Sequence, residues 1–133
     1  MKYSLLILMF LTLFSCNKNE DQGEPNGSLQ IINSLTQMTS ELESGVSLVF
    51  FHASWCSICQ SQRPAVSEVA VDPAFSIVFF GEVEYEDYPD IIDSHNVLGF
   101  PTIIIYDDGV EVERFEGGGH SASTIRAAIQ NLL

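Results

Sequence analysis

Positive charge is scarce in this chain of 133 residues. Only 5 Lys and Arg side chains stand against 18 Asp and Glu, which gives a formal net charge of -13. Such a surface repels phosphate backbones, and the sequence contains no basic stripe, so nucleic acid is not expected as a partner. An acidic surface also keeps a protein soluble, which is the simpler interpretation of this charge. The length is enough for one hydrophobic core and too short for two.

Apolar runs long enough to span a bilayer are also lacking. The nearly continuous run from Leu5 to Phe14 is shorter than the roughly 20 residues that a membrane-spanning helix needs. It follows the short positive start Met1-Lys2, and it resembles the apolar region of a secretory signal. We therefore expect residues 1–15 to be a signal peptide that is not part of the fold.

Cysteine occurs only three times, and an odd number would leave one thiol unpaired in an exported protein. The first, in Leu13-Phe14-Ser15-Cys16, lies in a segment that resembles the bacterial lipoprotein signal, in which the cysteine is lipidated and becomes the first mature residue. The alternative is an ordinary signal peptide with a chance cysteine. A lipid on Cys16 would anchor the protein in the cell envelope, facing the periplasm or the cell exterior, and would leave Cys56 and Cys59 as a pair.

The segment after Cys16 has no large apolar residue up to residue 28. It is typical of a flexible tether, so residues 16–28 are expected to link the lipid to a folded domain over residues 29–133.

Hydrophobic periodicity in that domain predicts alternating helices and strands. Strands separated by helical crossovers indicate a parallel core, and the turn at Asp108-Gly109 adds an antiparallel hairpin. The expected fold is α/β, with three layers and a central mixed sheet of about four strands flanked by helices. The predicted elements are helices at 29–42, 56–71, 90–97 and 121–133, and strands at 47–51, 77–83, 102–106 and 110–115.

Two of the cysteines, Cys56 and Cys59, lie where a predicted strand gives way to a helix. Cysteines three positions apart share one helix face, and a slightly tightened first turn can join them reversibly. At the helix N-terminus, free N–H groups and the helix dipole stabilise a thiolate on Cys56, which is the form that attacks disulfides. Cys59, one turn inside, suits the resolving role of attacking the mixed disulfide that Cys56 forms.

Several separated motifs resemble the thioredoxin superfamily over about residues 46–133. They are the strand end and aromatic residue of Phe51–Cys56, the helix proline Pro64, the loop Gly99-Phe100-Pro101-Thr102 and the glycine Gly117. The resemblance implies a thiol–disulfide oxidoreductase, without a cofactor, that exchanges disulfides with protein substrates. It also implies an upstream electron donor, and it favours the reductase direction, although oxidation and isomerisation stay open.

The same resemblance implies a substrate-docking surface. Pro101 should be cis, so that the Phe100 backbone can pair with a substrate peptide in β fashion. The alternative is a trans proline at the start of a strand. Trp55 and Phe100 would border an apolar surface, and Gly117 would lie near the substrate groove.

The sequence departs from thioredoxin proper at the active-site dipeptide Ser57-Ile58 and at two strand positions. Phe50 stands where the family often has a buried aspartate, and Glu82 where a lysine often pairs with it. One hypothesis is that Glu82 acts as the proton acceptor, with a pKa raised toward neutrality by burial. The alternative is a strand-end carboxylate that points to solvent.

A structural metal would need two ligands besides Cys56 and Cys59, but His52, His95 and His120 are isolated in the sequence, so no metal is expected. His95 and His120 are expected at the surface. Acidic residues between Glu82 and Asp93 lack the regular spacing of a calcium loop and are interpreted as a solvated face.

A non-catalytic binding or chaperone module is the alternative to a thiol–disulfide oxidoreductase.

Overall fold

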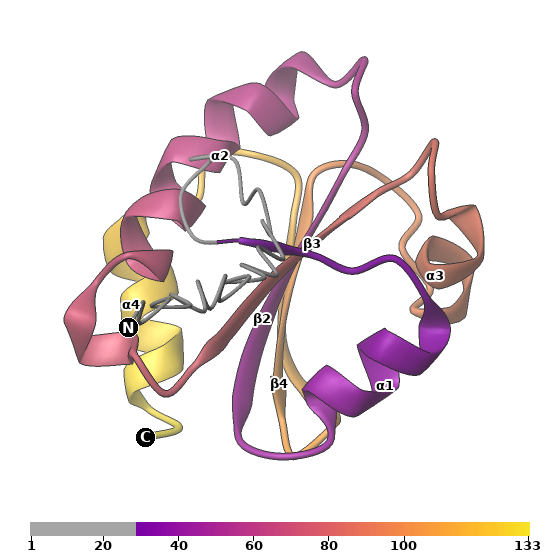
Figure 1. Cartoon of the computed structure of the whole chain (residues 1–133). Coiled ribbons are helices and arrows are strands. Elements are labelled where there is room, and N and C mark those ends of the chain that lie inside the picture. The colour runs from indigo at the N-terminus through magenta and orange to yellow at the C-terminus, as the bar shows by residue number, and fades with distance from the viewer. Residues whose placement is uncertain (1–28) are drawn as a thin grey trace, which may run out of the picture.

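The part of the chain that the structure describes, a computed structural model, runs from residue 29 to residue 133 (Figure 1). The signal peptide predicted at 1–15, the predicted lipidation of Cys16 and the tether predicted up to residue 28 all fall outside it. Within the described part, no helix combines the length and apolar character that crossing a membrane requires.

A mixed sheet of five strands forms the middle layer, in the order β1-β3-β2-β4-β5. Strands β1 and β2 pair with β3 in parallel, and β4 pairs antiparallel with both β2 and β5. The expected fold class is therefore confirmed, with one strand more than anticipated. The strands are β1 (Gln30–Ile31), β2 (Val46–His52), β3 (Phe79–Glu84), β4 (Thr102–Asp107) and β5 (Val110–Glu116).

The extra strand β1 corrects the predicted helix at 29–42, because helix α1 (Leu35–Leu42) begins only after Ser34. The Ser34 hydroxyl caps α1 by accepting a hydrogen bond from the Gln37 backbone N–H at 3.1 Å. Leu29 and Ile32 pack on opposite sides of the sheet. Their three-residue spacing fits one face of a helix, but it also fits the two faces of an extended segment.

Helices cover both faces of the sheet, and each face carries its own apolar core (Figure 1). Helices α2 (Ser57–Ala70) and α4 (Ala122–Gln130) pack on one face, and α1 and α3 (Pro89–Ser94) on the other; η1 (Pro73–Phe75) is a short 3-10 turn. Every residue of β2 from Val46 to Phe51 is buried because both faces of this central strand are covered.

Local capping and turn residues fix the ends of two C-terminal elements. Ser121 caps α4 by accepting from the Thr124 N–H at 3.2 Å. Asp108 and Gly109 join β4 to β5 with φ of 47° and 80°, the positive values that a tight two-residue hairpin requires. Pro64 lies inside α2, as expected.

Candidate active site

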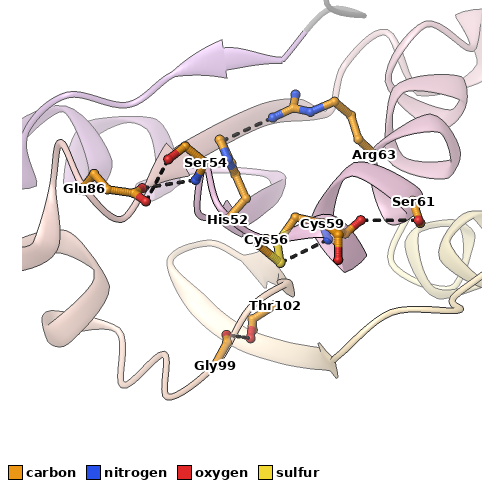
Figure 2. The surroundings of a disulfide bond; sticks show 10 residues. His52, Ser54, Cys56, Cys59, Ser61, Arg63, Glu86, Gly99 and Thr102 are labelled. Atoms are coloured by element: carbon orange, nitrogen blue, oxygen red, sulfur yellow. Dashed lines mark hydrogen bonds between the residues drawn. A yellow bond between two sulfur atoms is a disulfide. The ribbon is translucent and has the colours of Figure 1, made fainter.

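Cys56 and Cys59 lie at the junction of β2 and α2 and are joined by a disulfide, with their Cα atoms 5.2 Å apart (Figure 2). Cys56 is the N-cap of α2, and its Sγ accepts a hydrogen bond from the Cys59 N–H at 3.1 Å. Both residues are buried. A sulfur that receives an N–H bond at a helix start is placed to carry negative charge when the disulfide opens.

The turn before Cys56 is held by Glu86, a residue that the sequence analysis had assigned to a solvated acidic face. One Glu86 oxygen accepts from the Ser54 N–H at 3.2 Å, and the other accepts from the Ser54 hydroxyl at 2.9 Å (Figure 2). Burial raises the pKa of Glu86, but hydrogen bonds from backbone N–H groups and from the Ser54 hydroxyl outweigh it, so the net shift is downward. An ionised Glu86 therefore fixes the loop that leads into the cysteines.

The predicted proline loop lies beside the disulfide, where Figure 2 shows Gly99 and Thr102 next to Cys56. The Phe100–Pro101 bond is cis, as expected. The Thr102 hydroxyl donates to the Gly99 carbonyl at 2.8 Å, and the Pro101 carbonyl accepts from the Gly117 N–H at 2.9 Å. The structure thus brings the predicted glycine and proline together.

An exposed apolar surface adjoins this loop. The centroid of the Phe100 ring lies 6.1 Å from that of Trp55, in an edge-on arrangement, and 5.4 Å from that of Tyr85. The Trp55 and Leu98 side chains are 68% and 95% exposed and line a hollow of about 410 Å³ with these rings. Exposed apolar patches of this kind mark sites where other polypeptides dock.

Glu82 does not match either prediction made for it. Its side chain is only 12% exposed, so it does not point to solvent. One Glu82 oxygen lies 2.6 Å from Arg63 Nη2 and 3.1 Å from His52 Nε2. Burial raises the pKa of Glu82, but the contacts with His52 and Arg63 outweigh it and hold the pKa below its ordinary value. The expectation of a raised pKa was wrong because Arg63, on α2, was not recognised as a partner.

Gln62 was also missed by the sequence analysis. It is buried on α2, where its amide donates to the His120 carbonyl at 2.7 Å and accepts from the His120 N–H at 2.9 Å. This pair ties the glycine loop after β5 to the active-site helix, where a Cβ on Gly118 would stand 2.5 Å from Ile58 Cγ2. A glutamine in the buried stripe of α2, between Cys59 and Val66, was the available signal.

The histidines do not gather at the cysteines, and residues 29–133 contain no group of three or more His, Cys, Asp or Glu side chains placed to hold a metal ion. His95 is not the surface residue that was expected, because it is half-buried with its Nδ1 2.8 Å from the Tyr106 hydroxyl. His120 lies beside the glycine loop, with Nε2 3.1 Å from the Glu116 carbonyl oxygen.

Comparison with known proteins agrees with this geometry. The family model described as Thioredoxin matches residues 32–131. A thioredoxin of Chlamydia caviae is 31% identical over 98 residues, which cover 74% of this chain and 94% of that protein. A thioredoxin of Staphylococcus aureus is 32% identical over 78 residues, or 59% of this chain and 74% of that protein. The crystal structure of a Malassezia sympodialis thioredoxin superposes with a TM-score of 0.70 at 26% identity, covering 80% of this chain and 91% of the other.

Proposed function

Because the chain belongs to the thioredoxin family and is a thiol–disulfide oxidoreductase, we propose that it works as a disulfide reductase of the cell envelope, anchored by a lipid on Cys16. The observation that carries the catalytic part of the proposal is the Cys56 sulfur at the start of α2, beside an open apolar surface. The reductase direction is supported only by the resemblance to reducing members of the family. The anchor is supported by the sequence Leu13–Cys16 after an apolar run.

The proposed reaction begins with the reduced pair. The Cys56 thiolate attacks one sulfur of a substrate disulfide, forms a mixed disulfide and releases the other substrate sulfur as a thiolate. Cys59 then loses its proton and attacks Cys56 Sγ, which forms the Cys56–Cys59 disulfide and frees the second substrate sulfur. Two electrons pass from the pair to the substrate, and an upstream dithiol donor returns them.

Substrate docking follows from the surface around the pair. We expect the Phe100 backbone, next to the cis Pro101, to pair with an extended substrate segment, while the exposed Trp55 borders the side chains of that segment. The hydrogen bond from Gly117 to Pro101 keeps the two sides of this groove in register.

Reduction of insulin disulfides tests the catalytic assignment. We expect Cys56→Ser to lose activity to the uncatalysed background, since no other sulfur starts the exchange. The exposed Ser61→Ala, on the same helix, is the matched control and should keep wild-type activity. Full activity in Cys56→Ser would favour a non-catalytic binding module instead.

Trapping in the producing cell tests the direction and the substrates. Cys59→Ser should hold substrates on Cys56 as mixed disulfides, and loss of the protein should leave those same partners oxidised. Partners that accumulate in the reduced form instead would show an oxidase.

Mass spectrometry of the mature N-terminus tests the anchor, for which we expect a lipid-modified Cys16; an unmodified N-terminus at another residue would contradict it.

A further inference from the structure

Three charged or titratable side chains meet between the sheet and α2, where the proposed reaction gives them no part. His52 comes from the end of β2, Glu82 from β3 and Arg63 from α2. Their side chains are 12%, 12% and 25% exposed. Arg63 Nη2 lies 3.3 Å from His52 Nε2, and Figure 2 shows the guanidinium pointing back from α2 toward the imidazole. We call these three residues the His52 cluster.

The His52 cluster shares its side of the sheet with the disulfide. Phe50 and His52 are two residues apart on β2, so both face α2, and Glu82 is the register partner of Phe50 on β3. On α2, Cys59 and Arg63 are four residues apart and so lie on one helix face.

Phe50 connects the two groups. It is fully buried in the same core cluster as Cys56 and Cys59. Its ring stacks on His52 with centroids 5.3 Å apart, and the Arg63 guanidinium lies 5.2 Å from the ring centroid. The His52 cluster therefore borders the apolar core behind the disulfide, where charges are screened less than at the surface.

One carboxylate oxygen joins the His52 cluster. Glu82 Oε2 lies 2.6 Å from Arg63 Nη2 and 3.1 Å from His52 Nε2. Arg63 Nη1 is buried without a hydrogen-bond partner among the described residues. The imidazole therefore lies between a carboxylate and a guanidinium, close to both charges.

We propose that His52 is a positioning residue of the redox reaction, which takes up a proton when the Cys56–Cys59 disulfide opens and releases it when the disulfide closes. The charges of the ionised Glu82 and of Arg63 offset each other, and His52 is the remaining ionisable side chain of the cluster. The other charged groups that face His52 are Glu86, before α3, and Glu84, its register partner on β3.

Two electrons from a donor dithiol break the S–S bond, one proton from solvent goes to Cys59, and a second goes to His52. The products are the Cys56 thiolate, the Cys59 thiol and the imidazolium. The positive imidazolium stabilises the thiolate, so by linkage the reduced protein binds the His52 proton more tightly than the oxidised protein.

Proton NMR of the mature protein tests this coupling without any substitution. We expect the His52 ring signals to titrate at higher pH in the reduced than in the oxidised form, by roughly threefold or more in proton affinity. Equal midpoints in the two forms would overturn the proposal. The reductase assignment would survive that result, because it depends on insulin reduction and trapping rather than on this titration.

Equilibration with glutathione gives a second test. His52→Gln should disfavour the reduced form several-fold at about pH 6 relative to wild type, and the difference should vanish at about pH 9, because the proposed effect needs a bound proton. The matched control, His95→Gln, lies on the opposite face of the sheet and should leave the equilibrium unchanged at both pH values. A His52→Gln effect of the same size at every pH would indicate a purely structural role and would overturn the proposal.

Discussion

At the scale of single residues, Glu82 shows how one partner reverses an electrostatic expectation. Burial alone favours a neutral carboxyl, but Arg63 and His52 keep this one ionised. Since the folded protein binds this proton less tightly than the unfolded chain, Glu82 contributes stability above its ordinary pKa of 4.5, and that stability is lost as the pH falls below it.

Glu82→Gln is therefore expected to lower the free energy of unfolding by about 1–3 kcal/mol at pH 7, because it leaves Arg63 without its counter-charge. The difference from wild type should shrink between about pH 5 and about pH 3, the range in which carboxylates are protonated. Urea unfolding across that range measures it, with the exposed Glu43→Gln as control. A difference that stays constant down to the acid limit would contradict the ion-pair argument.

His95 provides a second pH-dependent term on the other face of the sheet. Burial lowers its pKa below the ordinary 6.5, and a neutral His95 can accept the hydrogen bond from the Tyr106 hydroxyl. The unfolded chain therefore takes up this proton first as the pH falls, and folding stability declines below about pH 6.5.

Between about pH 7 and about pH 5, we expect the melting temperature of His95→Gln to fall less than that of wild type. Calorimetry at the two pH values measures this, and His120→Gln serves as the histidine control. If His95→Gln and wild type lose the same number of degrees, the imidazole does not control acid stability.

At the scale of elements, the short edge strand β1 depends on a glycine in its neighbour. Gly81 on β3 pairs with Gln30, and a Cβ there would stand 2.6 Å from Ile32 Cδ1 and 2.8 Å from Phe79 Cε1. Ile32 is fully buried and cannot move aside into solvent. The missing side chain at residue 81 is thus what lets β1 pack against β3.

Gly81→Ala should accordingly destabilise the fold by about 1–3 kcal/mol through overpacking. Gly99→Ala is the matched control, since a Cβ at Gly99 meets nothing within 4 Å. Chemical unfolding of both variants compares the costs, and equal values would show that the space around Gly81 is not limiting.

At the scale of the whole molecule, negative charge exceeds what the ion pairs can balance. The described residues include three of the chain's 5 basic side chains, Arg63, Arg114 and Arg126, but most of its 18 acidic ones. Each of these arginines is already paired, with Glu82, with Glu111, and with Glu68 and Asp72 respectively. The remaining carboxylates repel one another in the compact state.

Screening should relieve this repulsion. We expect the melting temperature to rise by a few degrees when NaCl increases from about 0.02 to 0.5 M, where the Debye length falls well below the spacing of surface charges. Thermal unfolding followed by circular dichroism measures it, with KCl as the control for ion-specific effects. A lower melting temperature at high salt would mean that the favourable ion pairs outweigh the repulsion.

The sequence by itself determined the features that depend on neighbours along the chain. The placement of Cys56 and Cys59 at a helix start, the buried strand around Val49 and the hairpin at Asp108-Gly109 each follow from local periodicity, capping and backbone preference. The family resemblance added the cis Pro101 and its nearness to Gly117, because those motifs keep their order in the chain.

Only the tertiary structure decided which distant side chains meet. Gln62 and His120 are 58 residues apart, and Ser54 and Glu86 are 32 apart. Strand β1 could not be told from the start of a helix, since its pairing with β3 is a contact across the fold. The environment of Glu82 depended in the same way on Arg63, because charge and burial at a residue are set by everything that packs around it, and sequence spacing does not record that.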